Sequence, residues 1–256
     1  MQYAVCTVAA APLRKEPGHR SEMTSQLLFG DGVTLLEEKD EWCFIKGSAD
    51  GYEGWVTAHM LSLIESPDAA RHFVTTGLLN EVSLGNLRFQ IPMGCTLPGF
   101  DERTRSFLNG HYLFHGRCRN AAAPYTKELF QNTIVPWLNA PYLWGGKTFM
   151  GVDCSGFVQT VFKVLGIPLL RDAYQQAEEG ITVAELKSAK DGDVAFFNNE
   201  AGRIVHVGIV LEPGRIIHAS GKVRIDELTE EGIFNLESGK KTHTFHSLKR
   251  IADFKA

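Results

Sequence analysis

A single cysteine, Cys154, stands between a glycine-containing stretch and a segment of helical periodicity, and this junction constrains the fold more than any other feature of the chain. Before it, Tyr-Leu-Trp-Gly-Gly at 142–146 suits a tight loop whose backbone approaches its neighbours closely. Behind it, apolar residues recur at helical spacing: Phe157, Val158, Val161, Phe162 and Leu165. The thiol is therefore predicted at a helix N-terminus, where the helix dipole and unpaired N–H groups favour the nucleophilic thiolate.

The N-terminal part of the chain consists of short apolar segments separated by turn residues. Apolar and polar residues alternate with period two, and Gly-Asp, Asp-Gly and Lys-Asp steps break the segments. This pattern predicts a small, strongly bent β-barrel over residues 1–65. Trp42 and Trp55 are expected to fill its interior or to frame a groove. Tyr52 lies in a Gly-Tyr-Glu-Gly loop, which suits a contact outside the barrel.

A second, similar region follows a short break. Ser66-Pro67-Asp68 is predicted to be a linker. Short strand-like segments around Pro and Gly turns come after it, at 73–79, 87–91 and 112–116. They predict a second small barrel, and we place the second domain at residues 66–122.

The remaining residues, 123–256, are predicted to form the third domain. A helix is expected to begin near Thr126, the helix of Cys154 follows, and a short helix starts at Asp172. Three strands joined by Gly and Pro turns come next, at 194–197, 204–211 and 215–219. Helices followed by an antiparallel sheet form an α+β arrangement.

Two histidines in consecutive predicted strands are placed to serve the cysteine. A cysteine nucleophile needs a base, and the base needs a partner that fixes its tautomer. If the strands pair antiparallel around the turn at 212–215, His206 and His218 lie at the same end of the sheet. His206 then faces Cys154, and His218 orients His206. The alternative is a pair of core histidines next to an inert, buried cysteine.

Composition and charge exclude several classes of function. The net charge of −4 and the pI near 6.1 provide no basic field for nucleic acid. No apolar run approaches the roughly 18 residues of a membrane span. Neither a nucleic-acid partner nor a membrane partner is therefore expected. The chain is expected to be a monomer. The match of Gly146-Lys147-Thr148 to a phosphate-binding loop fails, because Pro141 stands where that motif needs glycine.

The cysteines indicate a reducing compartment. There are five of them, widely spaced and without a C-x-x-C pair, so neither a zinc site nor a redox dithiol is expected. No metal or other cofactor is expected. The odd cysteine count and the lack of a recognisable signal peptide favour the cytoplasm. The alternative is the periplasm or the cell surface, if a signal peptide has been removed.

Four sequence blocks identify a family resemblance. Tyr-Leu-Trp-Gly-Gly, Asp-Cys-Ser-Gly, His-Val-Gly-Ile and His-Ala-Ser, in this order, resemble the signature blocks of the NlpC-type cell-wall cysteine peptidases, the NlpC/P60 family. The resemblance covers about residues 125–256, and residues 28–61 resemble bacterial SH3-like domains. It implies a papain-like catalytic domain, with helices packed on an antiparallel sheet, preceded by two small SH3-like β-barrels.

The arrangement of domains resembles one subgroup of this family, the γ-D-glutamyl-L-diamino-acid endopeptidases. The resemblance implies a murein peptide substrate, cut between γ-D-Glu and the diamino acid and in some members bearing a free N-terminal L-Ala. Whether the diamino acid is diaminopimelate or Lys stays open. It also stays open whether the protein recycles imported murein peptides or remodels the cell wall. Another cysteine amidase or acyltransferase, or a murein-binding module with weak activity, is the alternative.

The resemblance assigns roles to residues around the cysteine. It makes Cys154 the nucleophile, His206 the general base and His218 the orienting residue. Tyr142 matches a cleft tyrosine whose hydroxyl helps to hold the developing oxyanion. Two further positions, Asp153 and Ser155, match cleft positions beside the thiol, with a helix cap as the alternative role for Asp153.

The resemblance also implies a site for the terminal amine of the substrate. Asp172 follows Arg171, as in the Arg-Asp pair of the subgroup, where the Asp meets that amine. The subgroup has serine next, but this chain has Ala173, so a hydroxyl contact is missing. From the first barrel, Tyr52 and one acid, Glu16 or Glu22, are expected to close the cleft over the amine. The alternative for these three is a solvated surface position.

Overall fold

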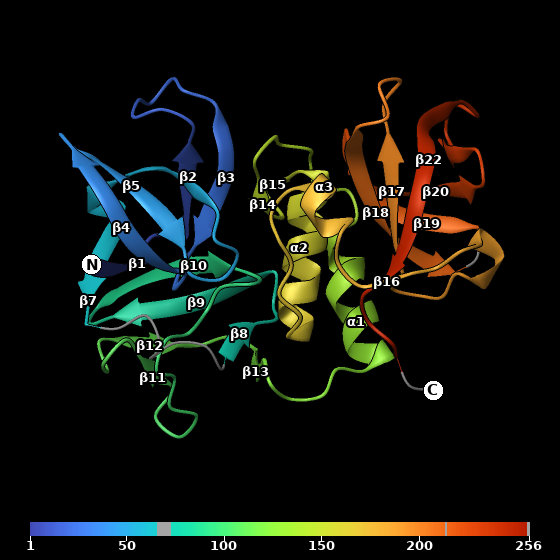
Figure 1. Ribbon diagram of the computed structural model, residues 1–256. Helices are drawn as coiled ribbons and strands as arrows, with labels where there is room; N and C mark the ends of the chain where they lie inside the picture. Colours follow the sequence, from blue (N-terminus) through green and yellow to red (C-terminus); the bar gives the residue numbers. More distant parts are fainter. Residues whose placement is uncertain (66–72, 213, 255–256) are drawn as a thin grey trace.

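The computed structural model describes residues 1–65, 73–212 and 214–254, and it places three α-helices between two strand-rich regions. Figure 1 shows the N-terminal strands on one side, the helices in the middle and the C-terminal strands on the other side. The predicted linker Ser66-Pro67-Asp68 lies outside the described residues.

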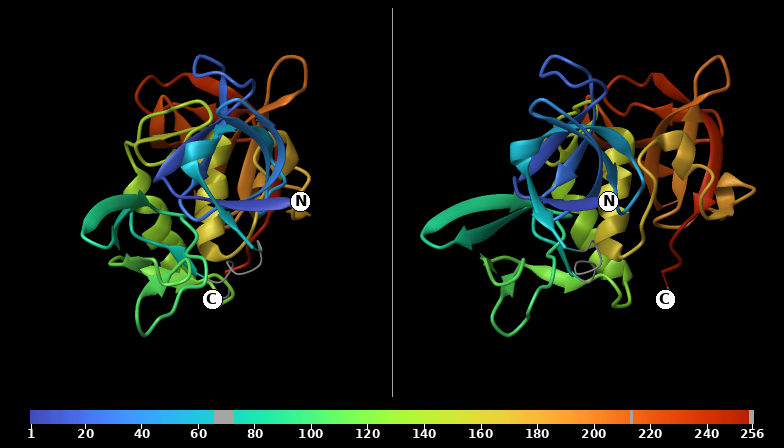
Figure 2. Two further views of the ribbon diagram at one scale, coloured as in Figure 1. Left: turned by 90° about the vertical axis from the view of Figure 1, so that its left-hand side faces the viewer. Right: turned by 60° about the vertical axis from the view of Figure 1, so that its left-hand side comes forward.

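The first seven strands form one antiparallel sheet that curls into a barrel, as Figure 2 shows. The strand order is β3-β2-β6-β5-β4-β1-β7. The bounds are β1 Gln2–Cys6, β2 Ala10–Arg14, β3 Met23–Leu28, β4 Gly32–Lys39, β5 Trp42–Gly47, β6 Glu53–Thr57 and β7 Leu61–Ile64, with the 3-10 turn η1 at Ala58–Met60. The sequence pattern does not predict β2, because Pro12 removes a backbone donor within it.

The two tryptophans of this barrel do not fill its interior. The buried cluster inside consists of small and aliphatic residues: Ala4, Cys6, Ala11, Leu13, Leu27, Val33, Cys43, Ile45 and Val56. Trp42 is buried under His19, with ring centroids 5.0 Å apart, and Trp55 is half-buried against Phe44. Of the two roles expected for Trp42 and Trp55, filling the barrel interior does not hold, because neither ring belongs to the buried cluster.

Six short strands follow and form two small sheets. The orders are β10-β9-β12-β11 and β13-β8. The bounds are β8 Phe73–Thr75, β9 Leu79–Leu84, β10 Leu87–Pro92, β11 Ser106–Phe107, β12 Tyr112–Phe114 and β13 Cys118–Asn120. Leu28 and Phe29 of the first barrel belong to the same buried cluster as Phe107 and Phe114. The two N-terminal regions therefore share a core and pack as one body.

The helices lie at the centre of the molecule. Their bounds are α1 Lys127–Ile134, α2 Cys154–Leu165 and α3 Ala173–Gln176. Thr126 caps α1, as predicted, by accepting the N–H of Leu129 at 3.1 Å. Nearly every residue of α2 is buried, and Gly166 ends the helix with φ of +85°. The surrounding short elements are η3 Val135–Trp137, β14 Lys147–Thr148, β15 Gly151–Val152 and η4 Leu186–Ser188.

The C-terminal strands form a closed barrel. The sheet order is β16-β22-β17-β18-β19-β20-β21, and an additional pairing of β22 with β21 closes six of the strands. The bounds are β16 Ile181–Thr182, β17 Val194–Asn198, β18 Ile204–Glu212, β19 Arg215–Ser220, β20 Lys222–Thr229, β21 Gly232–Phe234 and β22 Lys241–Arg250. The three predicted strands are β17, β18 and β19. The prediction of an α+β sheet holds only in part, because the chain is mostly sheet and this sheet closes on itself.

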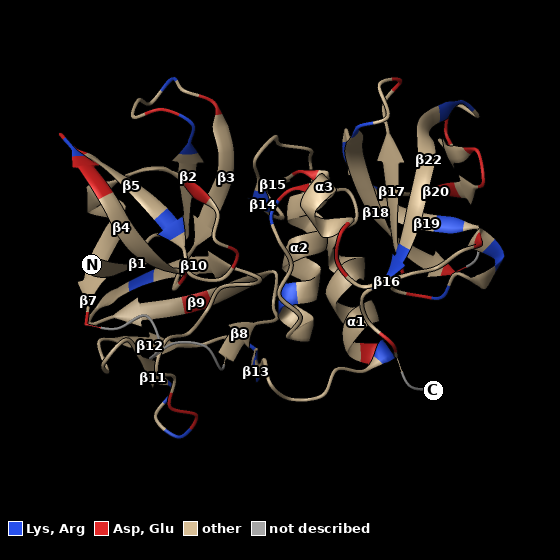
Figure 3. Cartoon of the chain, in the orientation of Figure 1, with Lys and Arg blue, Asp and Glu red and all other residues tan. Residues whose placement is uncertain are grey.

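Charged residues of both signs are distributed over all parts of the ribbon, as Figure 3 shows. Among the described residues, no helix has the length and apolar character that crossing a membrane requires.

Candidate active site

Cys154 is the first residue of α2, as its sequence context predicts. Asp153 caps the helix, and its carboxylate accepts the N–H groups of Gly156 at 2.7 Å and Gly145 at 2.8 Å. The thiol is buried, and the backbone N–H of Val207 lies beside it. Since Val207 follows His206 directly, the start of α2 abuts the strand that carries the predicted base.

The thiol is nevertheless protonated in the resting protein. Burial raises the pKa of the Cys154 thiol to about 12, and the neighbouring Asp153 carboxylate adds to this effect. The N–H groups of Val207 and Ser155 and the charge of Arg171 lower the pKa, but by less. The helix start favours the thiolate, as predicted, through the Ser155 N–H, but burial outweighs this effect and keeps the thiol protonated. A base must take the thiol proton during attack.

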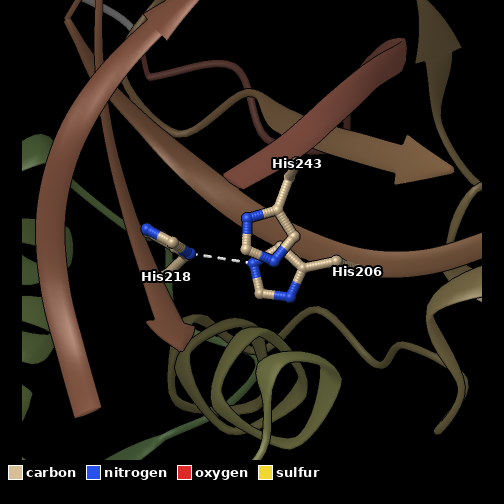
Figure 4. Close-up of side chains that lie close together, drawn as sticks. All are labelled: His206, His218 and His243. Carbon is tan, nitrogen blue, oxygen red and sulfur yellow. Dashed lines mark hydrogen bonds between the residues drawn. The ribbon is translucent and has the colours of Figure 1, made fainter. Parts of the chain in front are cut away.

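The register of β18 and β19 brings the two predicted histidines together. Gly208 lies opposite His218, and Glu212 lies opposite Arg215 at the turn. His206 is therefore diagonal to His218, with its Nε2 2.8 Å from His218 Nδ1, as Figure 4 shows. A Cβ atom on Gly208 would lie 2.8 Å from that of His218. The glycine of the His-Val-Gly-Ile block thus leaves room for the second histidine.

A buried carboxylate, which the sequence reasoning missed, continues this chain. Asp226 Oδ2 lies 3.0 Å from His218 Nε2, and Arg224 Nε donates to the same oxygen at 2.7 Å. Hydrogen bonds from His218 and Arg224 hold the pKa of Asp226 well below its usual range, despite burial. Asp226 follows His218 across a strand turn and belongs to none of the four sequence blocks. Only the pairing of β19 with β20 brings the two together.

The carboxylate fixes the tautomers of both imidazoles. An ionised Asp226 only accepts, so a His218 ring with one proton carries it on Nε2 and accepts at Nδ1. His206 then donates from Nε2, which leaves the lone pair of His206 Nδ1 free. Burial, aided by His243 and His218, lowers the pKa of His206 well below its ordinary value. His206 is therefore a neutral base at neutral pH.

A third imidazole, also missed, stacks on the base. The rings of His243 and His206 are 3.9 Å apart between centroids with an interplanar angle of 23°. Burial lowers the pKa of His243 to about 4, so this ring is neutral as well. Nitrogens of His206, His218 and His243 lie within 4.8 Å of one another. The lone pairs of two stacked rings lie in separate, nearly parallel planes, however, so the stack does not direct both at one metal ion.

Tyr142 lies beside the thiol. Its side chain is half-buried, and burial raises the pKa of Tyr142 to about 12, while Cys154 and the Asp153 carboxylate also raise it. The phenol therefore stays protonated and can donate a hydrogen bond, and its role at the oxyanion stays a prediction.

Asp153 and Ser155 are committed to a buried network. Arg171, which is 1% exposed, donates to Asp153 Oδ2 at 2.6 Å and to Ser155 Oγ at 2.8 Å. The same guanidinium donates from Nε to Ser25 Oγ of the first barrel at 2.9 Å. Asp153 therefore serves as a helix cap and an ion-pair partner. The network also joins the first barrel to the helices.

The first barrel brings Tyr52 to Asp172. Burial raises the pKa of the Tyr52 phenol, which lies beside the Thr24 hydroxyl and near Asp172. Asp172 immediately precedes α3, and its carboxyl is half-buried, with a pKa raised by burial and lowered in part by Arg171. Tyr52 of the first barrel and Asp172 before α3 are therefore near each other, and their contact with a substrate amine stays a prediction.

The two candidate acids of the first barrel differ in position. Glu22 Oε1 accepts the indole N–H of Trp144 at 2.9 Å, so it reaches the loop that precedes Cys154. Glu16 is exposed, and its backbone N–H bonds to Ser21 Oγ at 2.9 Å. Within the described residues, the Glu16 carboxylate forms no hydrogen bond or ion pair.

Two family models match parts of the chain. Residues 139–236 match the model of the NlpC/P60 family, and residues 13–61 match that of the bacterial dipeptidyl-peptidase Sh3 domain. The first match contains Cys154 and all but one of the site histidines. The second contains Tyr52, Glu16 and Glu22.

Proteins from two Bacillus species are similar over most of the chain. A γ-D-glutamyl-L-lysine dipeptidyl-peptidase of Bacillus subtilis is 31% identical, over 80% of this chain and 76% of the relative. The γ-D-glutamyl-L-lysine dipeptidyl-peptidase of Bacillus cereus is 26% identical, over 87% of this chain and 76% of the relative. A crystal structure of an NlpC/P60 family protein from Bacillus cereus has the same fold, with a TM-score of 0.82 at 22% identity, and covers 97% of this chain and 99% of that one.

Proposed function

The chain belongs to the NlpC/P60 family, and from this premise we propose that it is a cysteine peptidase of murein stem peptides that cuts the γ-D-glutamyl–L-diamino acid bond. The observation that carries the proposal is the hydrogen-bonded series from His206 through His218 to Asp226, which lies against the start of α2. The names of the two Bacillus relatives support the same bond.

The first half of the reaction forms a thioester. The Cys154 sulfur attacks the γ-carbonyl carbon of D-Glu, while the thiol proton moves to Nδ1 of His206. The Cys154 backbone N–H and the Tyr142 hydroxyl donate to the oxyanion. When the tetrahedral intermediate collapses, the C–N bond breaks, and the diamino acid leaves as an amine that takes the proton from His206.

The second half hydrolyses the thioester. A water molecule attacks the acyl carbon and gives a proton to His206, and the C–S bond breaks to release the γ-carboxyl product. His206 then returns the proton to the sulfur. His206 carries a positive charge in both steps, and the dipole of His218 together with the negative charge of Asp226 stabilises it.

The free N-terminal amine of the substrate is proposed to bind at the edge where the first barrel meets α3. Asp172, Tyr52 and Glu22 supply two carboxylates and a phenol there. Ala173 offers no hydroxyl, so this set takes over the contact that the serine of the subgroup makes.

Several finer features belong to the same proposal. We take the second predicted domain, residues 66–122, as an SH3-like barrel, of which residues 66–72 lie outside the described residues. We take the helices with the C-terminal barrel as a papain-like arrangement. We further propose a monomer that acts in the cytoplasm on imported murein peptides. All five cysteines are free, which supports a reducing compartment. Recovery of the natural protein with a cleaved signal sequence from the cell surface would contradict this placement.

The decisive experiment offers the protein two tripeptides, L-Ala-γ-D-Glu-meso-diaminopimelate and L-Ala-γ-D-Glu-L-Lys. Mass spectrometry then detects the free diamino acid. We expect release by the wild-type chain and none by Cys154→Ala. No release of either amino acid, or equal release by the variant, would overturn the proposal. N-acetylated versions of both tripeptides test the amine site and are expected to react more slowly.

A further inference from the structure

A cavity of about 320 Å³ lies where both N-terminal strand regions meet the helices. The first barrel contributes Asp31 and Asp50, the second region Thr96, and the helical region Lys147 and Lys163. Lys163 lies near the C-terminal end of α2, whereas the catalytic thiol begins that helix. None of the residues of the thiol and histidine site lines the cavity. Tyr52 of the proposed amine site lines one edge of the cavity, so the two spaces adjoin there, while the two lysines lie away from the thiol. The volume is near the lower end of the roughly 300–1,000 Å³ typical of small-molecule sites.

Lys147 places a positive charge in this space without a partner. It is 6% exposed, and its hydrogen bonds within the described residues use its backbone: the N–H donates to Gln26 Oε1 at 2.8 Å, and the C=O accepts from Thr160. No carboxylate of the described residues lies within ion-pair distance of its ammonium. Burial lowers the pKa of Lys147, although the charges of Asp31 and Asp50 act against it. A buried cation normally has a counter-ion, so the lack of one at Lys147 suggests that a ligand supplies it.

The other lysine of the cavity is already satisfied. Lys163 Nζ lies 2.6 Å from Asp31 Oδ1, and Thr96 Oγ1 donates to the same oxygen at 3.3 Å. The second oxygen of Asp31 accepts the N–H of Leu28 at 2.9 Å. This pair is neutral as a unit and bridges three parts of the fold. Figure 3 marks the basic residues on β14 and α2 that belong to this region.

Asp50 is the negative counterpart of Lys147. Its Oδ1 accepts the N–H of Tyr52 at 3.0 Å, and its Oδ2 accepts the amide N–H of Gln159 at 3.0 Å. Both donors are neutral, and no cation of the described residues lies within ion-pair distance of Asp50. The cavity therefore holds one cation and one anion without ionic partners, next to apolar walls such as Leu27 and Leu169.

We propose that this cavity binds a small zwitterion, an amino acid or a dipeptide, with its carboxylate at Lys147 and its ammonium at Asp50. Charge-assisted hydrogen bonds would then satisfy both ions, and the apolar walls would accept a short side chain. Because the lining comes from three regions of the chain, an occupied cavity holds the barrels and the helical region together. The proposal concerns a second site and does not depend on the proposed peptidase substrate.

The experiment measures binding to the full chain by calorimetry with three matched probes. L-alanyl-L-alanine carries both charges, N-acetyl-L-alanine only the carboxylate, and L-alaninamide only the ammonium. We expect the dipeptide to bind at least about tenfold more tightly than either singly charged probe, because each charged contact contributes about one order of magnitude or more. It should also raise the melting temperature of the chain.

Three variants locate the binding. Lys147→Met keeps the length of the side chain and removes the charge, so affinity for the dipeptide should fall at least about tenfold while the free protein melts no lower than wild type. Asp172→Asn removes a proposed cleft contact and should leave this binding unchanged. Lys187→Met, at an exposed lysine, is the control for loss of one positive charge.

Three results would overturn the proposal. One is the absence of dipeptide binding at millimolar concentration, which would indicate a cavity that holds water only. Another is binding that survives in Lys147→Met but is lost in Asp172→Asn, because the dipeptide would then occupy the cleft. The third is equally tight binding of N-acetyl-L-alanine, because Asp50 would then have no role.

Discussion

The Nε2 atom of His206 lies 2.8 Å from Nδ1 of His218, and this bond determines which nitrogen of the base faces the reaction. His218 accepts at Nδ1 only because its own proton is held on Nε2 by Asp226. The reactivity of His206 thus depends on a carboxylate two hydrogen bonds away.

Asp226→Asn should inactivate the enzyme while leaving its fold intact. An asparagine amide in place of the carboxylate donates to His218 Nε2, which shifts the His218 proton to Nδ1 and the His206 proton to the nitrogen that must accept from the thiol. We expect kcat to fall about 10²- to 10⁴-fold with little change in KM. Steady-state kinetics with a circular dichroism control will test this. Glu237→Gln, at the exposed second partner of Arg224, should keep nearly full activity, and an equal loss there would contradict the tautomer argument.

The stacked histidine should make stability depend on pH. The pKa of His243 falls from 6.5 to about 4 in the folded chain, so between these values the unfolded chain binds a proton that the folded chain does not. Stability therefore rises with pH in this window and is lost as pH falls through it. Urea unfolding at a series of pH values between about 7 and 4 measures the slope. His206, whose pKa also lies well below its ordinary value, contributes to the same slope. His243→Phe keeps a stacked ring and should reduce the slope by the share of one proton, and an unchanged slope would show that His243 does not contribute.

Gly208→Ala should damage the site through packing alone. The added Cβ would lie 2.8 Å from the Cβ of His218 and 2.8 Å from Ile216 Cδ1, so β18 and β19 must shift apart. Overpacking of this kind costs about 1–3 kcal/mol, and a shift at His218 also lowers kcat. Thermal unfolding and kinetics should show both effects. Gly18→Ala is the matched control, since no atom lies within 4 Å of its added Cβ, and full activity of Gly208→Ala would refute the steric argument.

The acid that meets the substrate amine can be identified by two matched changes. Glu22→Gln keeps an acceptor for the Trp144 indole but removes the negative charge near the cleft. We expect KM for the tripeptide with a free amine to rise several-fold, by the roughly 1–2 kcal/mol of a charge-assisted contact, with kcat nearly unchanged. Glu16→Gln on the same barrel should change neither constant. The reverse pattern would assign the role to Glu16.

Loss of Arg171 should destabilise the fold strongly. Its guanidinium is the partner of a buried carboxylate, Asp153, at 2.6 Å. Arg171→Met leaves that charge uncompensated, which costs about 3–5 kcal/mol, while the double change with Asp153→Asn should recover part of the loss. Denaturant unfolding of both variants tests this, with Arg203→Met at an exposed site as control. A loss below about 1 kcal/mol would contradict the view that this ion pair stabilises the fold.

The sequence by itself determined the elements that depend on local periodicity and on short motifs. The start of α2 at Cys154, the cap at Thr126 and the strands of His206 and His218 follow from the spacing of apolar residues and from turn residues that lie within a few positions of one another. The turn at 212–215 is short enough to set the register, so the adjacency of the two histidines was predictable as well.

Only the tertiary structure decided which distant residues complete the site. His243 reaches His206 because β22 pairs with β17, which lies next to the strand of His206. Asp226 reaches His218 from the neighbouring strand β20. The protonation of Cys154 was also beyond the sequence, because helix position favours the thiolate and burial opposes it more strongly. Strand pairing and burial depend on residues far apart in the chain, whereas periodicity depends on neighbouring residues. The sequence therefore predicted the nucleophile and its base, but not the residues that set their protonation.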